Sequence, residues 1–177
     1  MKLLDTTGNG NSKIAKTQAL TSGIRLAQLS LHPDNELCPG SKAAQCMDDC
    51  LLYSGLAAVY DSVNEARARK SEFFKTDEAG FLDQLRRELH NFLKLCAKLG
   101  LTPWVRLNVL SDVAWEKYGI SQEFPDLNFY DYTKRAARLL KTPANYHLMF
   151  SYSGASKYHN QVLKAFDTGV PIATVFR

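Results

Sequence analysis

Apolar positions along the chain follow two spacings, one typical of strands and one typical of helices. The longest helical stripe, within residues 77–99, consists of Phe81, Leu85, Leu89, Phe92, Cys96 and Leu99. Gly100 follows this stripe and is the residue type that commonly ends a helix. Residues 1–22 are polar and small, so we predict irregular structure there.

The same pattern divides the rest of the chain into alternating elements. Strands are predicted at residues 23–33, 102–112, 127–130, 145–153 and 171–177. Helical segments are predicted at residues 46–74, 77–99, 114–118, 134–141 and 156–169. Strands that alternate with helices indicate a parallel sheet with right-handed crossovers. We therefore expect a single α/β domain over residues 1–177, either as an open sheet or as a partial (β/α) barrel.

Composition narrows the class of protein without naming a function. Of the 177 residues, 45% are hydrophobic and 23% are charged, which is ordinary for a globular chain. The net charge of +4 is compatible with phosphate or nucleic-acid binding but is too small for a dedicated DNA-binding domain. No apolar run reaches the length of a signal peptide or a membrane span, so we expect a cytoplasmic protein without membrane contact.

Three of the four cysteines lie within the stretch "LCPGSKAAQCMDDC". Cys38, Cys46 and Cys50 have the spacing C-x7-C-x3-C, and His32 lies just before them. Clustered cysteines in a reducing compartment indicate a metal or catalysis more often than a disulfide. Cys96 lies on the apolar helical stripe and is expected to be a core residue.

Two metals fit the cysteine cluster, and a structural alternative remains. Three thiolates after the first predicted strand are similar to the arrangement in radical S-adenosylmethionine enzymes, where they hold an iron–sulfur cluster. The spacing differs from the C-x3-C-x2-C of those enzymes, and a glycine-rich cofactor motif is not evident. Zinc held by the three cysteines and His32 is the second possibility. Otherwise the cysteines are small buried hydrophobic residues.

Polar side chains follow the predicted strands where each one ends. In parallel α/β folds, ligands bind at this edge of the sheet. We assign Asp112 and Asp131 as candidate catalytic groups, with helix capping as the alternative for each of them. Lys134, Tyr132 and Ser151 are candidate substrate or phosphate ligands at the same edge.

Five motifs in order resemble the gene product eighty-eight family of tailed bacteriophages. They are "GNSKIAKT", "LSLHPDNELCPGSKAAQCMDDCL", "WVRLNVLSDVAWE", "FYDYTKR" and "YHLMFSYSGAS". The matching positions include Cys38, Cys46, Cys50, Arg106, Asp112, Tyr130, Asp131, Tyr132, Lys134 and Ser151. The resemblance implies a phage origin and action inside the infected bacterium. It supplies no activity, so residue roles rest on their chemistry.

Two functions are consistent with these observations. The first is a metal-dependent enzyme of the radical iron–sulfur type that acts on a nucleotide or nucleic acid, with S-adenosylmethionine as a possible second cofactor. The second is a non-enzymatic phage protein with a structural zinc site that binds host protein or nucleic acid. The identity of the metal and the presence of an open coordination position distinguish the two.

Overall fold

The computed structural model describes residues 1–7, 18–27, 37–47, 50 and 55–174. Its sheet has six strands: β1 (Leu4–Thr7), β2 (Ala19–Ile24), β3 (Thr102–Arg106), β4 (Asn128–Thr133), β5 (Tyr146–Ser151) and β6 (Ile172–Ala173). The α-helices are α1 (Asp61–Thr76), α2 (Glu78–Leu99), α3 (Ile120–Glu123) and α4 (His159–Phe166). Short 3-10 turns, η2 to η5, cover Gly55–Ala58, Trp115–Tyr118, Ala136–Arg138 and Ser156–Tyr158.

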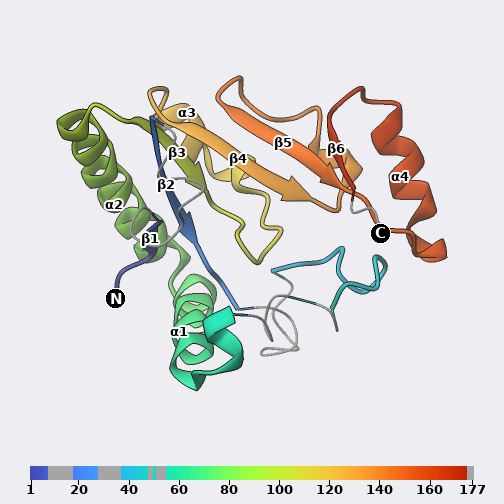
Figure 1. The fold of residues 1–177 in the computed structure, drawn as a ribbon, viewed down its shortest axis with the longest axis horizontal. Helices are drawn as coiled ribbons and strands as arrows, with labels where there is room; N and C mark the ends of the chain where they lie inside the picture. Colours follow the sequence, from blue (N-terminus) through green and yellow to red (C-terminus); the bar gives the residue numbers. More distant parts are fainter. Residues whose placement is uncertain (8–17, 28–36, 48–49, 51–54, 175–177) are drawn as a thin grey trace.

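The strands lie side by side in the same order as in the sequence (Figure 1). β1 pairs antiparallel with β2, and every other neighbouring pair is parallel. The sheet is open, with β1 at one edge and β6 at the other. The prediction of an α/β fold is confirmed in its open-sheet form, and the sheet does not close into a barrel.

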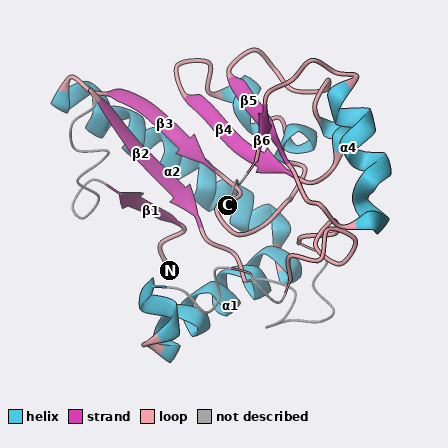
Figure 2. Cartoon of the chain, turned by 45° about the vertical axis from the view of Figure 1, so that its right-hand side comes forward, coloured by secondary structure: helices cyan, strands magenta, loops and turns pink. Residues whose placement is uncertain are grey.

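One face of the sheet carries the hydrophobic core. The strand register places Val105, Phe129, Tyr146, Leu148 and Phe150 on this face, and all of them are buried. The buried side chains of α2 belong to the same core cluster. Figure 2 shows α2 behind the strands, so this helix forms the second layer of the fold.

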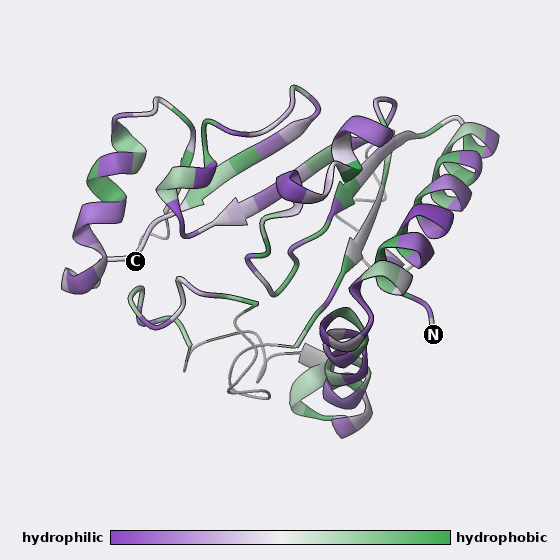
Figure 3. Ribbon diagram, turned by 180° about the vertical axis from the view of Figure 1, so that it is seen from behind, coloured by the Kyte–Doolittle hydropathy of each residue, from purple (hydrophilic) through white to green (hydrophobic). Residues whose placement is uncertain are grey.

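The helix α2 follows the sequence prediction because both of its ends carry the expected signals. The Asp77 side chain accepts a hydrogen bond from the Gly80 amide at 2.9 Å, and Gly100 ends the helix in the left-handed conformation, with φ 65°. Leu85 and Leu89 are fully buried, as predicted, whereas Leu99 is 53% exposed and lies outside the core. Hydrophobic and hydrophilic residues alternate along this helix (Figure 3).

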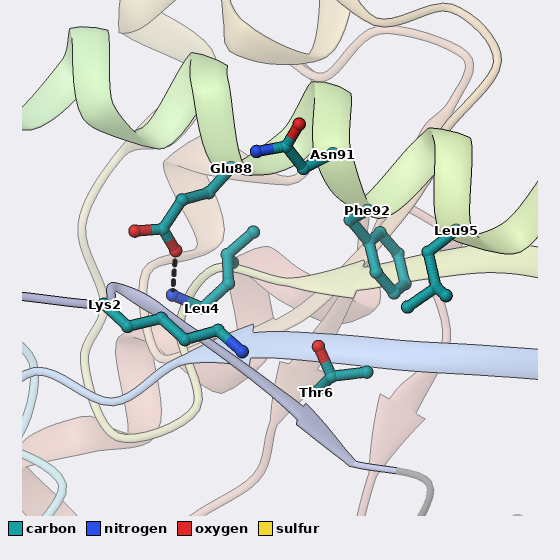
Figure 4. Close-up of a pocket in the computed structure, with 7 residues that line it drawn as sticks. All are labelled: Lys2, Leu4, Thr6, Glu88, Asn91, Phe92 and Leu95. Atoms are coloured by element: carbon teal, nitrogen blue, oxygen red, sulfur yellow. Dashed lines mark hydrogen bonds between the residues drawn. The ribbon is translucent and has the colours of Figure 1, made fainter.

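The prediction of an irregular segment at residues 1–22 is wrong for its described residues, 1–7 and 18–22, whereas residues 8–17 lie outside the described part of the chain. β1 and most of β2 lie within this segment. Glu88 anchors β1, because its carboxylate accepts hydrogen bonds from the Leu3 amide at 2.9 Å and from the Leu4 amide at 2.7 Å. Figure 4 shows the bond to Leu4. A pocket lined by Leu4, Glu88 and Phe92 lies between β1 and α2. The two strands were not predicted because they are only four and six residues long and lie among small and polar residues.

Several other predicted boundaries shift for local reasons. The strand predicted at 23–33 begins earlier, at Ala19, and ends at Ile24. The helix predicted at 46–74 begins only at Asp61, after the turn η2. The strand predicted at 102–112 ends at Arg106. The Asn108 amide then donates to the side chain of Asp131 on β4 instead of to a backbone carbonyl of that strand. The helix predicted at 134–141 is only the turn η4.

We expect the core contact of α2 to be measurable with a matched pair of leucines. Leu85→Ala should lower the free energy of unfolding by about 2–5 kcal/mol, because it leaves a cavity under the sheet. Leu95 is 40% exposed on the same helix, so Leu95→Ala should change it by only about 0.5 kcal/mol. Chemical denaturation of both variants tests this, and equal losses would contradict the packing described.

Candidate functional site

The cysteine loop lies over the carboxyl ends of three strands. It folds on itself through hydrogen bonds from the Ser41 amide to the Cys38 carbonyl and from the Cys46 amide to the Ser41 carbonyl, at 3.1 and 3.2 Å. The Asp112 amide donates to the Leu37 carbonyl at 2.7 Å, and the Ser153 hydroxyl donates to the Ala44 carbonyl at 2.7 Å. Figure 1 shows the loop beside the arrowheads of β4 and β5.

Close packing fixes this loop against the residue that follows β4. A Cβ atom on Gly40 would lie 2.8 Å from the Cβ of Lys134, closer than real contacts allow. Only glycine therefore fits at this position without moving the chain. The loop is built to touch the end of β4, which explains the Pro-Gly pair inside the cysteine stretch.

The three loop cysteines are half-buried and form no disulfide with one another, and the charges of Cys46 and Cys50 act on Cys38. The pKa of Cys38 is raised to about 12, mainly by burial and also by the negative charges of Asp112, Cys46 and Cys50, while Lys134 opposes the shift. Cys38 therefore stays a neutral thiol at neutral pH. Binding a metal ion would reverse this preference, because the cation stabilises the thiolate.

The described residues contain no group of three His, Cys, Asp or Glu side chains already arranged around one point for a metal ion. His32, the fourth ligand in the zinc hypothesis, lies outside the described residues. Cys96 is buried on α2 with 1% exposure, where the sequence places it. The metal assignment for Cys38, Cys46 and Cys50 thus stays a prediction.

Asp112 lies at the predicted edge of the sheet, and internal partners occupy both of its carboxylate oxygens. One oxygen accepts from the Thr133 hydroxyl at 2.8 Å and from Arg138, and the other accepts from the Lys134 amide at 3.1 Å. Arg135 adds a contact to the Asp112 carbonyl at 2.6 Å. This carboxylate joins the end of β3 to the end of β4.

Arg138 is the counterion that holds this arrangement together. Its guanidinium is 4% exposed and contacts both Asp112 and Glu116, the second with hydrogen bonds of 2.9 and 2.8 Å. Burial alone would lower the pKa of Arg138, but the hydrogen bond to Glu116 and the charge of Asp112 raise it above its ordinary value. The arginine therefore carries its charge inside the fold.

Asp131 lies within β4 on the core face and is fully buried. Its carboxylate accepts from the Asn108 amide at 2.8 Å and from the Tyr146 hydroxyl at 2.7 Å. Burial raises the pKa of Asp131, and hydrogen bonds from Tyr146 and Asn108 counteract part of this shift, so that the resulting pKa is about 7. Asp131 therefore connects β3 to β5 beneath the edge rather than on it.

Asn108 organises the turn that carries Asp112. Its side-chain oxygen accepts from the Ser111 hydroxyl, the Val113 amide and the Trp115 indole at 2.9, 2.9 and 3.0 Å. Its side-chain nitrogen donates to the Val113 carbonyl at 2.9 Å. These contacts hold the segment after β3 in place without regular secondary structure.

The predicted ligands Lys134 and Ser151 contact each other at the same edge. The Lys134 ammonium lies 3.0 Å from the Ser151 hydroxyl and 5.7 Å from the centre of the Tyr158 ring. The following turn η4 is too short to offer a helix N-terminus. Tyr132 lies on the opposite face from Asp131, with the Arg106 guanidinium 4.9 Å from its ring centre.

The structure thus brings Asp112, Lys134 and Ser151 to the cysteine loop and places Asp131 below it. A pocket lined by Leu37, Pro39, Asp112, Lys117 and Arg135 opens beside the loop. Sequence reasoning did not single out Arg138. The signal for it was the pair Asp112 and Glu116, four residues apart, which needs a cationic partner once both are buried.

A family model described as Gene product 88 matches residues 2–177. The chain belongs to the Gene product 88 family. The predicted family is therefore confirmed over nearly the whole chain. No curated protein and no solved structure matches it. Among the described residues, none of the helices has the length and apolar character to cross a membrane.

Removing the buried arginine should destabilise the fold strongly. Arg138→Met removes the buried cation between Asp112 and Glu116 and leaves Asp112 only the half-buried Arg135, at 3.5 Å, so we expect a loss of about 3–5 kcal/mol in the free energy of unfolding. Arg87 is exposed on α2, and Arg87→Met is the matched control with little expected change. Thermal or chemical denaturation measures both, and similar values for the two variants would refute the role of Arg138.

Asp131 should make stability depend on pH. Because its pKa is raised from 3.8 to about 7, the folded state keeps a proton that the unfolded state has lost between these values. This contribution is fully present below the unfolded pKa and is lost as the pH rises through the folded pKa. The free energy of unfolding of Asp131→Asn, relative to the unchanged protein, should therefore increase with pH across this window.

The control for this pH series is a carboxylate in the turn before β4. Asp126 is exposed there, so Asp126→Asn should leave the pH profile of the unchanged protein in place. Denaturant titrations at several pH values supply the comparison. A parallel pH profile for Asp131→Asn and the unchanged protein would show that the buried carboxyl does not titrate as described.

Proposed function

We propose that the chain is a metal-binding phage protein that acts on a nucleotide or nucleic acid, with Cys38, Cys46 and Cys50 as its metal ligands. The observation that carries the proposal is the placement of the cysteine loop. It lies over the carboxyl ends of parallel strands, where α/β proteins bind their ligands. The charges of Cys46 and Cys50 contribute to the raised pKa of Cys38, which supports the proximity of the three side chains.

The thiol chemistry favours a soft metal. Thiolates select zinc or iron–sulfur clusters over magnesium and calcium, which prefer oxygen ligands. In the iron–sulfur form, three cysteines would leave one coordination position open, and S-adenosylmethionine is the cofactor class that such a position accepts in similar enzymes. Lys134 and Arg135 beside the loop would favour a negatively charged substrate. Reduced thiols suit the cytoplasm of the infected cell.

A second candidate function is supported by a specific observation. Both carboxylates expected to do catalysis are engaged in internal contacts, Asp112 with Arg138 and Asp131 with Tyr146. Such contacts suit a structural role better than proton transfer. A non-enzymatic protein with a structural zinc site, which binds nucleic acid or host protein, is therefore the alternative.

Metal analysis of individual cysteine variants tests the proposal. Protein purified without oxygen should contain either iron with acid-labile sulfide or zinc. Cys46→Ala and Cys50→Ala should lose that metal, because each removes a ligand. Cys96→Ala is the matched control, since Cys96 is buried on α2, and it should keep the metal at some cost in stability.

The result also separates the two candidate functions. Iron with sulfide supports the enzyme, and zinc in protein of the same fold supports the structural alternative. Folded protein that contains neither metal would overturn both. Equal metal loss in Cys46→Ala, Cys50→Ala and Cys96→Ala would instead make Cys96 a ligand and contradict its placement in the core.

A further inference from the structure

The second face of the sheet is not covered by the helices of the described chain. Strands in consecutive order with crossovers of one hand place their helices on a single face. The buried residues of α2, α3 and α4 belong to the same core cluster as Val105, Phe129 and Phe150. The residues between these on each strand point the other way and are half-buried or exposed.

Large aromatic side chains gather on this second face. We call it the aromatic face, and it comprises Trp104, Arg106, Tyr130, Tyr132 and His147. Tyr130 pairs with His147 across β4 and β5, and Trp104 lies on the neighbouring strand β3. The centre of the Trp104 ring is 6.0 Å from that of Tyr130 and 5.8 Å from that of His147.

The face of a sheet that meets water is usually polar, so several aromatic residues on such a face indicate a binding surface. Trp104, Tyr130 and Tyr132 are only half-buried, and His147 is exposed. Their rings lie on three adjacent strands of a rigid sheet, and adjacent strands are about 4.8 Å apart. Each ring therefore has a fixed place, which suits the binding of other flat groups.

The charge on the aromatic face is positive. On the described strands β3, β4 and β5, this face carries no aspartate or glutamate, since Asp131 points to the core. Arg106 lies over the Tyr132 ring at 4.9 Å, and its buried Nε atom lies 3.9 Å from the Asp131 carboxylate. Because 27% of the Arg106 side chain is exposed, the rest of the guanidinium can meet an anionic ligand on this face.

Flat aromatic and anionic groups occur together in nucleic acids. We propose that the aromatic face binds single-stranded nucleic acid, with bases stacked on Trp104 and Tyr130 and a phosphate near Arg106. Sheets with exposed aromatic residues bind single strands in this way because every base has a face to stack and the backbone is negatively charged. The inference rests on the nucleic-acid part of the proposed function and not on the metal.

Fluorescence anisotropy with a labelled 12-nucleotide oligothymidine, and with its oligouridine counterpart, tests the inference. Trp104→Leu and Tyr130→Leu should each weaken binding by about 5- to 150-fold, the range for loss of one stacked base. Trp104→Phe keeps a ring and should recover most of the affinity. Phe166 is 62% exposed on α4, so Phe166→Leu is the matched control and should bind normally.

The dependence on salt tests the contribution of Arg106. Arg106→Gln should lower the affinity and reduce the slope of log affinity against log salt by about one, as expected for one lost phosphate contact. A duplex of the same length should bind more weakly than the single strand, because its bases are already stacked. Thymidine monophosphate should bind much more weakly, because it offers one base and one phosphate.

Several results would overturn the inference. The first is absence of oligonucleotide binding at low salt, and the second is binding that Trp104→Leu and Tyr130→Leu leave unchanged. If the duplex bound as tightly as the single strand, the binding would be a non-specific charge effect. If thymidine monophosphate bound as tightly as the single strand, the ligand would be a mononucleotide. The metal proposal is tested by the metal content of the cysteine variants, and this inference is tested by the oligonucleotide affinity of Trp104→Leu and Tyr130→Leu, so the two can fail independently.

Discussion

The structure at the carboxyl ends of the strands depends on the contacts of the Asp112 carboxylate. This carboxylate fixes the Thr133 hydroxyl and the Lys134 amide at the end of β4, while the backbone amide of the same residue holds the cysteine loop at Leu37. A buried carboxylate with these contacts is stable only if its charge is balanced. Arg138 supplies that balance, and it does so by binding Glu116 as well. The position of the cysteine loop therefore depends on an ion pair that the loop itself does not contain.

Sequence reasoning succeeded where local signals and long-range packing agree. The helix α2 has a capping aspartate, a C-terminal glycine and an apolar stripe that packs against the sheet, so each signal predicts the same element. β5 alternates buried and more exposed residues, and its buried positions Tyr146, Leu148 and Phe150 are apolar in the sequence. The open α/β sheet followed from these elements.

The same reasoning failed where tertiary contacts decide the structure. β1 has four residues and is held by a glutamate from α2, 84 positions away from Leu4, which no local pattern reveals. The sequence placed Asp112 and Asp131 near the ends of their strands but could not show that their oxygens are already occupied. That depends on Arg138 and Tyr146, which reach them only after folding. Polar residues at the end of a strand therefore predict where their side chains lie better than they predict what those side chains do.

The described part of the cysteine loop meets the sheet close to the aromatic face. Lys134 is the first residue after β4 and follows Tyr132 by two positions, and its ammonium reaches Ser151 on β5 at 3.0 Å. Gly40 of the cysteine loop packs against Lys134. A strand of nucleic acid lying along the aromatic face would therefore reach the loop at the edge of the sheet. In that arrangement the core face holds the buried acids that stabilise the fold, and the opposite face is left to the ligand. The separation follows from the period of two in a strand, which sends Asp131 inward and its neighbours Tyr130 and Tyr132 outward.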